Sequence, residues 1–180
     1  MTHKKNLAGI LLHGILSHAD VLVRDDILAT DISEAGVQIR RNRQEPANHR
    51  MIHDYAPLYI NPKNPMLSAR RSIQHEIVLL KISAEVLQDG QHVFSDGNAA
   101  SHGTRFSSNS NIVGDSIGVL NAKTWFDYDD GKRRRCAELL VYPKVQPIHI
   151  LSAICSNNTL AEEIAMGTNL QIEVNPSMFF

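Results

Sequence analysis

The chain has 180 residues, of which 43% are hydrophobic and 21% are charged, and its formal net charge is -1. This length can bury one substantial core but is short for two, so we expect a single domain over residues 1–180. A nearly neutral chain has no global positive field to attract phosphate, which excludes a uniformly basic nucleic-acid binder and leaves only local patches for such contacts.

Cysteine usage and the start of the chain point to the cytoplasm. Cys136 and Cys155 are the only cysteines, which excludes a multi-disulfide framework and a four-cysteine zinc site. The basic start turns apolar, but His13, Gly14 and His18 interrupt the apolar run, so we interpret it as folded structure rather than a secretory signal. No apolar run approaches the roughly 20 residues that a membrane-spanning helix needs, so we expect a soluble, cytoplasmic protein.

The first part of the chain predicts helices, a loop and a short strand. Apolar residues at helical spacing follow Asn6, a residue type that caps helices, and Gly14 or the pair Ser17-His18 ends this helix. From residue 19 to residue 50 the pattern weakens around a basic run, which predicts a further helix and a long loop. Residues 55–60 favour a short strand, which the prolines at 57, 62 and 65 interrupt.

The rest of the chain predicts most of the strands. Ser83 begins a short helix that ends at Asp89-Gly90, and residues 158–166 form a helix with Gly167 past its end. Apolar, branched runs indicate strands at 76–82, at the start of 92–101, at 137–142, at 148–155 and at 171–174. Strands and helices do not alternate steadily, which favours an α+β fold with a mostly antiparallel sheet over a doubly wound one.

Common nucleotide and metal motifs are missing. Neither the GxGxxG fingerprint nor a Walker loop occurs, so any NAD must be held in another way. The nine histidines include no HExxH motif and no HxH pair, so we expect no metal.

Glu138 is the most informative single residue, because it lies among apolar neighbours in CAELLVY. A carboxylate on such a strand must face a cleft, the solvent or a partner. For an arbitrary protein, the ordinary interpretation is a solvent-facing glutamate on the polar side of an amphipathic strand. Periodicity alone therefore does not make Glu138 catalytic.

Basic and aromatic residues offer a path for a nucleic acid. The basic runs at 40–43, 70–71 and 132–135 can line phosphates, and the third leads directly into the strand of Glu138. The alternative is that these runs are solvated loops balanced by nearby acids. Several aromatic residues can stack on bases or on a nicotinamide ring, although such residues are more often core: Tyr55, Tyr59, Phe106, Trp125, Phe126 and Tyr128.

The segment HDYAPLYINPKNPML, from His53 to Leu67, resembles the HDYVPFYFxPRSPML segment of the DarT family of DNA ADP-ribosyltransferase toxins. Four more blocks resemble this family in the same order: THKKNLAGILLHGILS near the start, IRR at 39–41, VFSDGNAAS at 93–101 and CAELLV at 136–141. Together they cover most of the chain. The resemblance implies an ADP-ribosyltransferase-like fold, with a split, mostly antiparallel β-sheet core and flanking helices.

The resemblance also implies the chemistry: ADP-ribose moves from NAD to a base of single-stranded DNA, and nicotinamide leaves. Glu138 then stabilises the positive charge that develops on the ribose and helps to activate the base. Arg41 is the second catalytic residue and can hold the NAD pyrophosphate in a two-pronged manner. The implied partner is a macrodomain-containing antitoxin of the DarG type, and no metal or membrane is involved.

Further site residues follow from the same resemblance. The residues placed around NAD are Thr2, His3, Asn6, Arg40, Tyr59 and Met66. The residues placed along the DNA strand are His102, Lys132, Arg133 and Arg134.

This chain departs from the family at its start, where the family has a strand with a tyrosine-histidine pair before the threonine that corresponds to Thr2. The resemblance therefore implies that the usual NAD-anchoring histidine is missing from the 180 residues, and three explanations stay open: the start is placed too late, another group such as His3 replaces the histidine, or this member has lost activity. In this form we expect the chain to bind NAD weakly or not at all. Milder departures can alter packing and base choice: Ala56, Leu58, Ile60 and the pair Lys63-Asn64.

Two alternatives from other classes stay open. One is a catalytically impaired, DNA-binding relative, which the departure at the start favours. The other is an ADP-ribosyltransferase that acts on RNA or protein.

Overall fold

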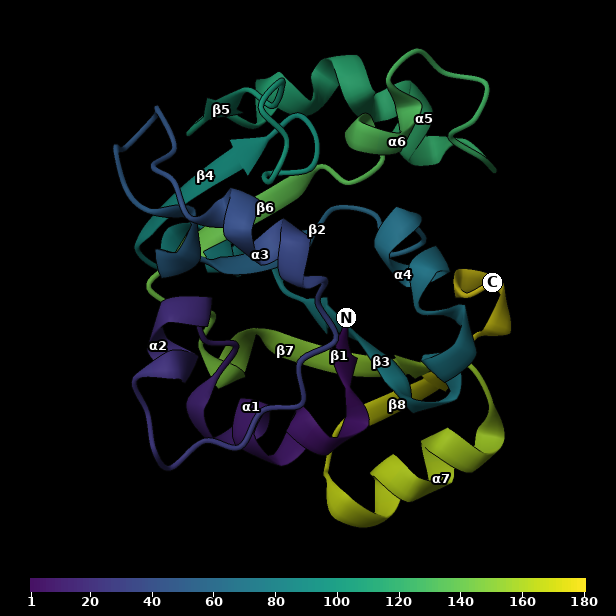
Figure 1. Ribbon diagram of the computed structural model, residues 1–180. Coiled ribbons are helices and arrows are strands. Elements are labelled where there is room, and N and C mark those ends of the chain that lie inside the picture. The colour runs from purple at the N-terminus through teal and green to yellow at the C-terminus, as the bar shows by residue number, and fades with distance from the viewer.

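The computed structural model describes residues 1–180 and contains two four-stranded sheets, one in the upper and one in the lower half of Figure 1. The lower sheet has the order β1-β3-β7-β8, with β1 Thr2–His3, β3 Ile77–Ile82, β7 Ile150–Cys155 and β8 Gln171–Val174. The upper sheet has the order β2-β6-β4-β5, with β2 Ala56–Tyr59, β6 Glu138–Tyr142, β4 Gln91–Ser95 and β5 Phe106–Ser107. Only the β7–β8 pair is parallel. The predicted α+β fold with a split, mostly antiparallel core is confirmed.

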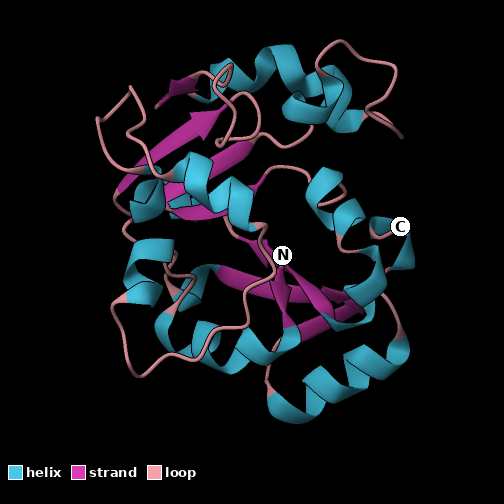
Figure 2. Cartoon of the chain, viewed as in Figure 1, coloured by secondary structure: helices cyan, strands magenta, loops and turns pink.

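Short helices flank the two sheets (Figure 2). They are α1 Leu7–His13, α2 His18–Leu22, α3 Ala35–Arg41, α4 Pro65–Ala69, α5 Ile117–Asn121, α6 Gly131–Arg134 and α7 Asn158–Gly167. Several 3₁₀ turns connect them to the strands, among them the one at Ala84–Gln88 that Ser83 predicts. No helix is long and apolar enough to cross a bilayer.

The predicted elements match the structure in most places, and the differences have local causes. The stretch from residue 19 to residue 50 contains two helices, α2 and α3, rather than one. Asn6 does not cap α1, because its side chain pairs with the backbone of Thr30 instead. Gly167 is the last residue of α7 rather than the residue past its end.

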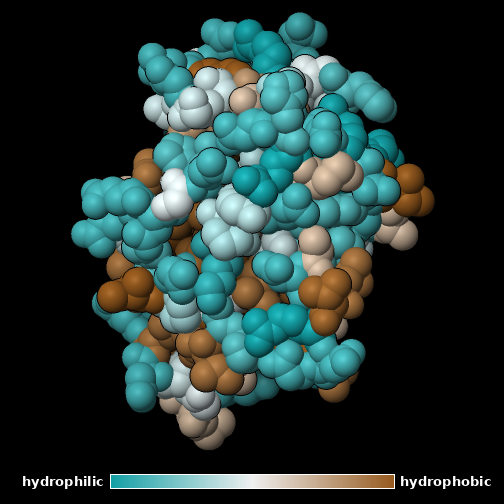
Figure 3. Space-filling model, turned by 90° about the vertical axis from the view of Figure 1, so that its left-hand side faces the viewer, coloured by the Kyte–Doolittle hydropathy of each residue, from teal (hydrophilic) through white to brown (hydrophobic).

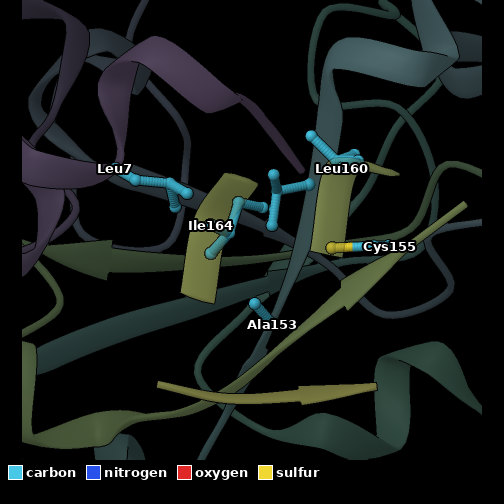
Figure 4. Close-up of a cluster of buried hydrophobic side chains, with 6 residues drawn as sticks. Leu7, Ala153, Cys155, Leu160 and Ile164 are labelled. Carbon is cyan, nitrogen blue, oxygen red and sulfur yellow. The ribbon is translucent and has the colours of Figure 1, made fainter. Parts of the chain in front are cut away.

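The lower sheet packs against α1 and α7. Leu160 and Ile164, four residues apart on α7, lie with Leu7 of α1 over Ala153 and Cys155 of β7 (Figure 4), and all five side chains are buried. The spacing of four residues places the two α7 side chains on one face of the helix. This core orients the start of the chain, where β1 pairs with β3.

The upper sheet sets the position of Glu138. β6 lies between β2 and β4, and the register pairs Glu138 with Tyr59 on one side and with Ser95 on the other. Leu140 and Val141 of β6 are fully buried, so the strand is held from both neighbours and both faces. A one-residue slip would turn every side chain of β6 to the opposite face, so the register itself places the carboxylate.

Apolar side chains gather over the lower half of the face that carries α1 and α2, whereas the upper half is mostly hydrophilic (Figure 3). The large exposed apolar residues of α1, of α2 and of the segment after it are Leu12, Leu22, Val23 and Leu28. On this face, the polar surface thus lies over the half that contains the sheet of Glu138.

Gly14 offers a direct test of how α1 is attached to the fold. Its φ is 90°, and a Cβ at this position would lie 2.2 Å from the carbonyl oxygen of Val145. We expect Gly14→Ala to lower the free energy of unfolding by about 1–3 kcal/mol, because alanine resists this backbone conformation and clashes with fixed backbone. Urea denaturation followed by circular dichroism measures the change.

The matched control is Gly9→Ala in the same helix, where an added Cβ meets nothing within 4 Å. Alanine in a helix interior has the better propensity, so this variant should gain about 0.4–1 kcal/mol. Equal stabilities of the two variants would mean that the turn at Gly14 is not a fixed part of the fold.

Candidate active site

Glu138 is a buried carboxylate with three hydrogen bonds. Its side chain is at the start of β6 and only 1% of the residue is exposed. Arg41 Nη1 donates to Oε2 at 2.9 Å and to Oε1 at 3.2 Å, and the backbone N–H of Ala99 donates to Oε1 at 2.9 Å. The solvent-facing interpretation of this residue is therefore wrong, because a partner 97 residues away covers the carboxylate.

Arg41 is the last residue of α3 and is buried as well. Its Nη1 is used by Glu138, whereas its Nη2 is buried and has no hydrogen-bond partner in the protein. A buried guanidinium N–H without an acceptor costs about 1–3 kcal/mol or more. The pair thus has Nη2 left as a buried donor for a ligand.

The pair lies at a cavity of about 370 Å³. Its walls come from α3, from the 3₁₀ turn Ile52–Asp54, from β2 and from α4, and its lining includes the predicted residues Arg40, Arg41, Tyr59, Met66, Lys132 and Glu138. Segments from widely separated parts of the chain therefore bring together most of the residues that the resemblance assigns to catalysis and NAD.

Tyr59 and Cys136 show how water-poor this region is. Burial, followed by the negative charge of Glu138, raises the pKa of the Tyr59 hydroxyl well above its usual range. The same two causes raise the pKa of the Cys136 thiol to about 12. Both groups therefore stay protonated at neutral pH, so neither one is an anionic nucleophile.

A pair of histidines also lines the cavity. The rings of His18 and His53 have centroids 4.6 Å apart, and His53 Nε2 lies 3.1 Å from Gln38 Oε1. Burial, then the neighbouring His18 and Arg41, lower the pKa of His53. His53 is thus neutral at pH 7, which suits a hydrogen-bonding role beside a cation.

The segment before α3 forms part of the cavity wall and is held by two side chains. Arg70 donates to the carbonyl oxygens of Ile32 and Ser33, at 2.6 Å each. Asn6 accepts from the N–H of Thr30 at 2.7 Å and donates to its carbonyl at 2.9 Å. Asn6 therefore acts on the cavity through this segment rather than as one of the residues that line it.

A shallower groove adjoins the cavity and contains the predicted DNA residues His102, Lys132 and Arg133. Arg40, Asn98, Lys132 and Cys136 line both, so the two spaces are continuous. The side chains of His102, Lys132 and Arg40 are exposed and form no hydrogen bond or ion pair within the chain. They are free to meet a polyanion.

Arg133 and Arg134 differ from these free groups. Arg133 pairs with Asp130 and, at 2.6 Å, with the buried Asp96, which also receives Arg105 at 2.8 Å. Burial alone would raise the pKa of Asp96, but the hydrogen bonds from Arg105 and Arg133 outweigh it and lower that pKa. Arg134 bonds to the Asp129 carbonyl and to Ser116, away from both the cavity and the groove.

The remaining predicted residues lie at the start of the chain and do not line the cavity of Glu138. Thr2 and Asn6 line a second, apolar cavity of about 480 Å³ between α1, β2 and β3. His3 lines neither; its Nε2 is 3.7 Å from Glu76 and its Nδ1 accepts from the N–H of Lys5. These three residues therefore lie outside the cavity of the Arg41–Glu138 pair, although the second cavity adjoins it, since Met1 and Pro57 line both.

Sequence reasoning missed several groups around the carboxylate. Ser95 Oγ accepts from the N–H of Glu138 at 3.1 Å and donates to the Gly97 carbonyl at 2.7 Å. Gly97 itself has no room for a side chain, since a Cβ would lie 2.4 Å from an Arg133 nitrogen. These residues belong to the block VFSDGNAAS, which the family resemblance singles out without giving Ser95, Gly97 or Ala99 a role.

Comparison with known proteins agrees with the resemblance in the sequence. A family model described as ssDNA thymidine ADP-ribosyltransferase, DarT, matches residues 1–180. The chain is 31% identical over 157 residues to a DNA ADP-ribosyl transferase of Thermus sp., which covers 79% of this chain and 72% of that protein. It is 29% identical over 189 residues to the DNA ADP-ribosyl transferase-DNA ADP-ribosyl glycohydrolase fusion protein of Thermosipho africanus, and spans about half of that relative's length, 48%.

Solved structures show the same fold. The Thermus sp. 2.9 DarT in complex with ADP-ribosylated ssDNA superposes with a TM-score of 0.86 at 25% identity, covering 99% of this chain and 93% of that chain. The Thermosipho africanus DarTG in complex with ADP-ribose gives a TM-score of 0.86 at 28% identity, covering 99% of this chain and 50% of that chain.

The burial of the ion pair predicts a stability effect. Glu138→Ala should lower the free energy of unfolding by roughly 3–5 kcal/mol, because it leaves the Arg41 charge buried without a partner. The double variant Glu138→Leu/Arg41→Met removes both charges and should lose less than the single variant. Urea denaturation of the two proteins and the parent measures this difference. A Glu138→Ala protein as stable as the parent would contradict it.

Proposed function

The chain belongs to the DarT family of ssDNA thymidine ADP-ribosyltransferases, and on that premise we propose that residues 1–180 form one catalytic domain that transfers ADP-ribose from NAD to a thymidine base of single-stranded DNA. The observation that carries this proposal is the buried Arg41–Glu138 pair at the cavity, with Arg41 Nη2 left unpaired. A carboxylate and an unsatisfied cationic donor together suit a substrate that carries both developing positive charge and anionic oxygens.

The reaction breaks the bond between the ribose C1 and the nicotinamide nitrogen. Nicotinamide leaves with the bonding electron pair, so positive charge develops on the ribose as in glycoside cleavage. A base nitrogen then forms the new bond to C1 and loses its proton. The carboxylate of Glu138, which Ala99 and Arg41 hold, stabilises this charge in the proposed mechanism. It accepts a hydrogen bond from a ribose hydroxyl, and it can also take the proton of the base.

Arg41 contributes through the nitrogens that Glu138 leaves unpaired. A two-pronged grip on the pyrophosphate can leave Nη1 on Glu138, because the other edge of the guanidinium presents Nε and Nη2, and neither of these bonds within the chain. Arg41 can therefore fix the carboxylate and contact a substrate oxygen at the same time. This double use explains why a buried cation is retained at a site that also needs a buried anion.

The other residues assigned to NAD fall into two groups, one at the cavity of Glu138 and one outside it. Tyr59 and Met66 line the cavity of Glu138 and suit the nicotinamide end, while the exposed Arg40 lies where cavity and groove join and suits a phosphate. Thr2, His3 and Asn6 support the site from the neighbouring strand and segment. That His3 anchors NAD stays a prediction.

The DNA strand runs in the groove, with its target base in the cavity. His102 and Lys132 are exposed along the groove and can meet phosphates or bases, whereas Arg133 is already neutralised by Asp96 and Asp130. We assign Arg134 a weaker part, because it faces away from the groove. A base inside a duplex is inaccessible without flipping, which favours single strands.

An antitoxin of the DarG type is the proposed protein partner. The Thermosipho relative joins a DNA ADP-ribosyl transferase to a DNA ADP-ribosyl glycohydrolase in one chain, and a separate glycohydrolase with a macrodomain would reverse the modification in the same way. The proposed location is the cytoplasm, where the DNA and NAD are found.

Activity tests the assignment of Glu138. Glu138→Gln keeps the shape of the side chain and removes its charge, so we expect kcat for DNA modification to fall by about 10²–10³-fold. Nicotinamide release with and without a thymidine-containing oligonucleotide is the measurement. Asp89→Asn removes a carboxylate that pairs with His149 outside the cavity, and it should leave kcat unchanged. A folded Glu138→Gln protein with parental kcat would overturn the mechanism.

The same assay separates the alternatives. A catalytically impaired DNA-binding relative binds the oligonucleotide and releases no nicotinamide, whereas an enzyme for RNA or protein releases nicotinamide only when one of those acceptors is supplied.

Salt dependence tests the groove. Modification should require single-stranded DNA and weaken as salt rises, and Lys132→Ala should lower the salt slope of binding by about 0.7, the value for one phosphate on a single strand. Lys81→Ala, an exposed lysine of β3 in the other sheet, is the control and should leave the slope unchanged. Efficient labelling of an intact duplex at any salt concentration would contradict this path.

A further inference from the structure

The backbone N–H of Ala99 donates one of the three hydrogen bonds that hold the Glu138 carboxylate, and Ala99 belongs to a loop rather than to a strand. Ala99 is completely buried, yet the loop around it has no regular ladder to fix its position. The segment before Ala99 is fixed at Asn98, whose N–H donates to the Arg133 carbonyl at 2.9 Å and whose carbonyl accepts from Thr104 Oγ1 at 2.6 Å. The 2.9 Å bond from Ala99 to the carboxylate also depends on what anchors the loop after Ala99.

Arg43 provides that anchor. Its Nη2 donates to the carbonyl oxygen of Ala99 at 3.0 Å and to that of Ser101 at 2.9 Å. The guanidinium also lies over the ring of Phe106, with 5.7 Å between Cζ and the ring centroid. The peptide units before and after the Ala99 Cα are thus both fixed. Glu138 binds the Ala99 N–H, and Arg43 binds the Ala99 carbonyl.

Arg43 comes only two residues after Arg41, at the end of α3. Its backbone is fixed as well, because its carbonyl accepts from the N–H of Ile52 at 3.0 Å. The end of α3 therefore reaches the carboxylate by two routes, directly through Arg41 and indirectly through Arg43 and the Ala99 amide. A charged donor on a backbone carbonyl makes a stronger bond than a neutral donor does.

We propose that Arg43 is a positioning residue for the reaction, which holds the loop 98–101 so that the Ala99 N–H binds Glu138 and so that Asn98 and His102 stay in place beside the groove. Arg43 itself lines neither the cavity nor the groove. The proposal rests on the proposed function for its effect on catalysis. Its structural part, the fixation of the Ala99 amide, is independent of that function.

The test compares Arg43→Ala with the conservative Arg43→Lys and with Arg50→Ala. Arg50 is a matched control: like Arg43, it adjoins the isolated β-bridge that pairs Gln44 with Met51. It packs on the Tyr142 ring with 3.5 Å between Cζ and the centroid, and it bonds to Gln91 rather than to the loop. Two readouts are taken, namely kcat and KM for DNA modification, and hydrogen exchange of the Ala99 amide by NMR, with the β6 amides as an internal reference.

We expect Arg43→Ala to lower kcat at least ten-fold, with a smaller change in the KM for NAD, and to speed exchange of the Ala99 amide while the β6 amides stay protected. Arg43→Lys, whose ammonium can reach the same carbonyls, should recover part of both effects. Arg50→Ala should change neither. If Arg43→Ala does not fold, Arg43→Lys and Arg43→Gln are compared with the parent by the same two readouts.

The proposal is overturned if the Ala99 amide stays protected in a folded Arg43 variant, or if Arg43→Ala and Arg50→Ala lose kcat equally and in proportion to their stability. A parent protein that modifies no DNA would contradict the proposed function, yet the exchange of Ala99 would still decide whether Arg43 holds the loop.

Discussion

The ion pair between Arg41 and Glu138 is the interaction on which the rest of the site depends. Moving two charges out of water costs several kcal/mol per ion, and their attraction compensates only when the geometry is good and further hydrogen bonds satisfy the remaining groups. Here the carboxylate meets this condition through Arg41 and Ala99, whereas the guanidinium does not, because Nη2 has no partner. The imbalance leaves the site incomplete on its cationic side, which is the side that a ligand with anionic oxygens can complete.

Holding this pair explains several otherwise unrelated features of the fold. β6 lies in the interior of the upper sheet, so its register is determined by β2 and β4 together, and Ser95 binds the Glu138 N–H from the neighbouring strand. Gly97 lets the following loop approach Arg133 closely, which brings Ala99 to the carboxylate. α3, although only seven residues long, ends at the point where its last side chain meets β6. Its position is set by tertiary contacts rather than by helix propensity, as expected for a helix this short.

The sequence predicts the strands well but predicts the contacts between distant residues poorly, because strand signals are local and those contacts are not. Apolar runs such as IVLLKI and ELLVY are local signals, because a buried strand needs them whatever it packs against. The burial of Glu138 is not local: it depends on Arg41 and Ala99, and no pattern around residue 138 reveals them. Asn6 illustrates the same limit, since a residue that caps helices by type pairs here with Thr30, 24 residues away. The resemblance supplied Arg41, Tyr59 and Met66, which line the cavity, but periodicity supplied none of them.

The distribution of charge in the groove bears on how a neutral chain recognises a polyanion. Of the basic residues near the groove, Arg133 is paired with acids, and Arg134 faces elsewhere, which leaves Arg40 and Lys132 as free cations. On the proposed path, two free cations would neutralise about two phosphates, so the backbone would contribute a shallow salt dependence and little affinity. Most discrimination must then come from the cavity, where buried hydrogen-bonding groups penalise a base that leaves them unpaired. The near-zero net charge of the chain is therefore compatible with DNA as a substrate, provided that the enzyme identifies its target through the base and holds the strand only weakly.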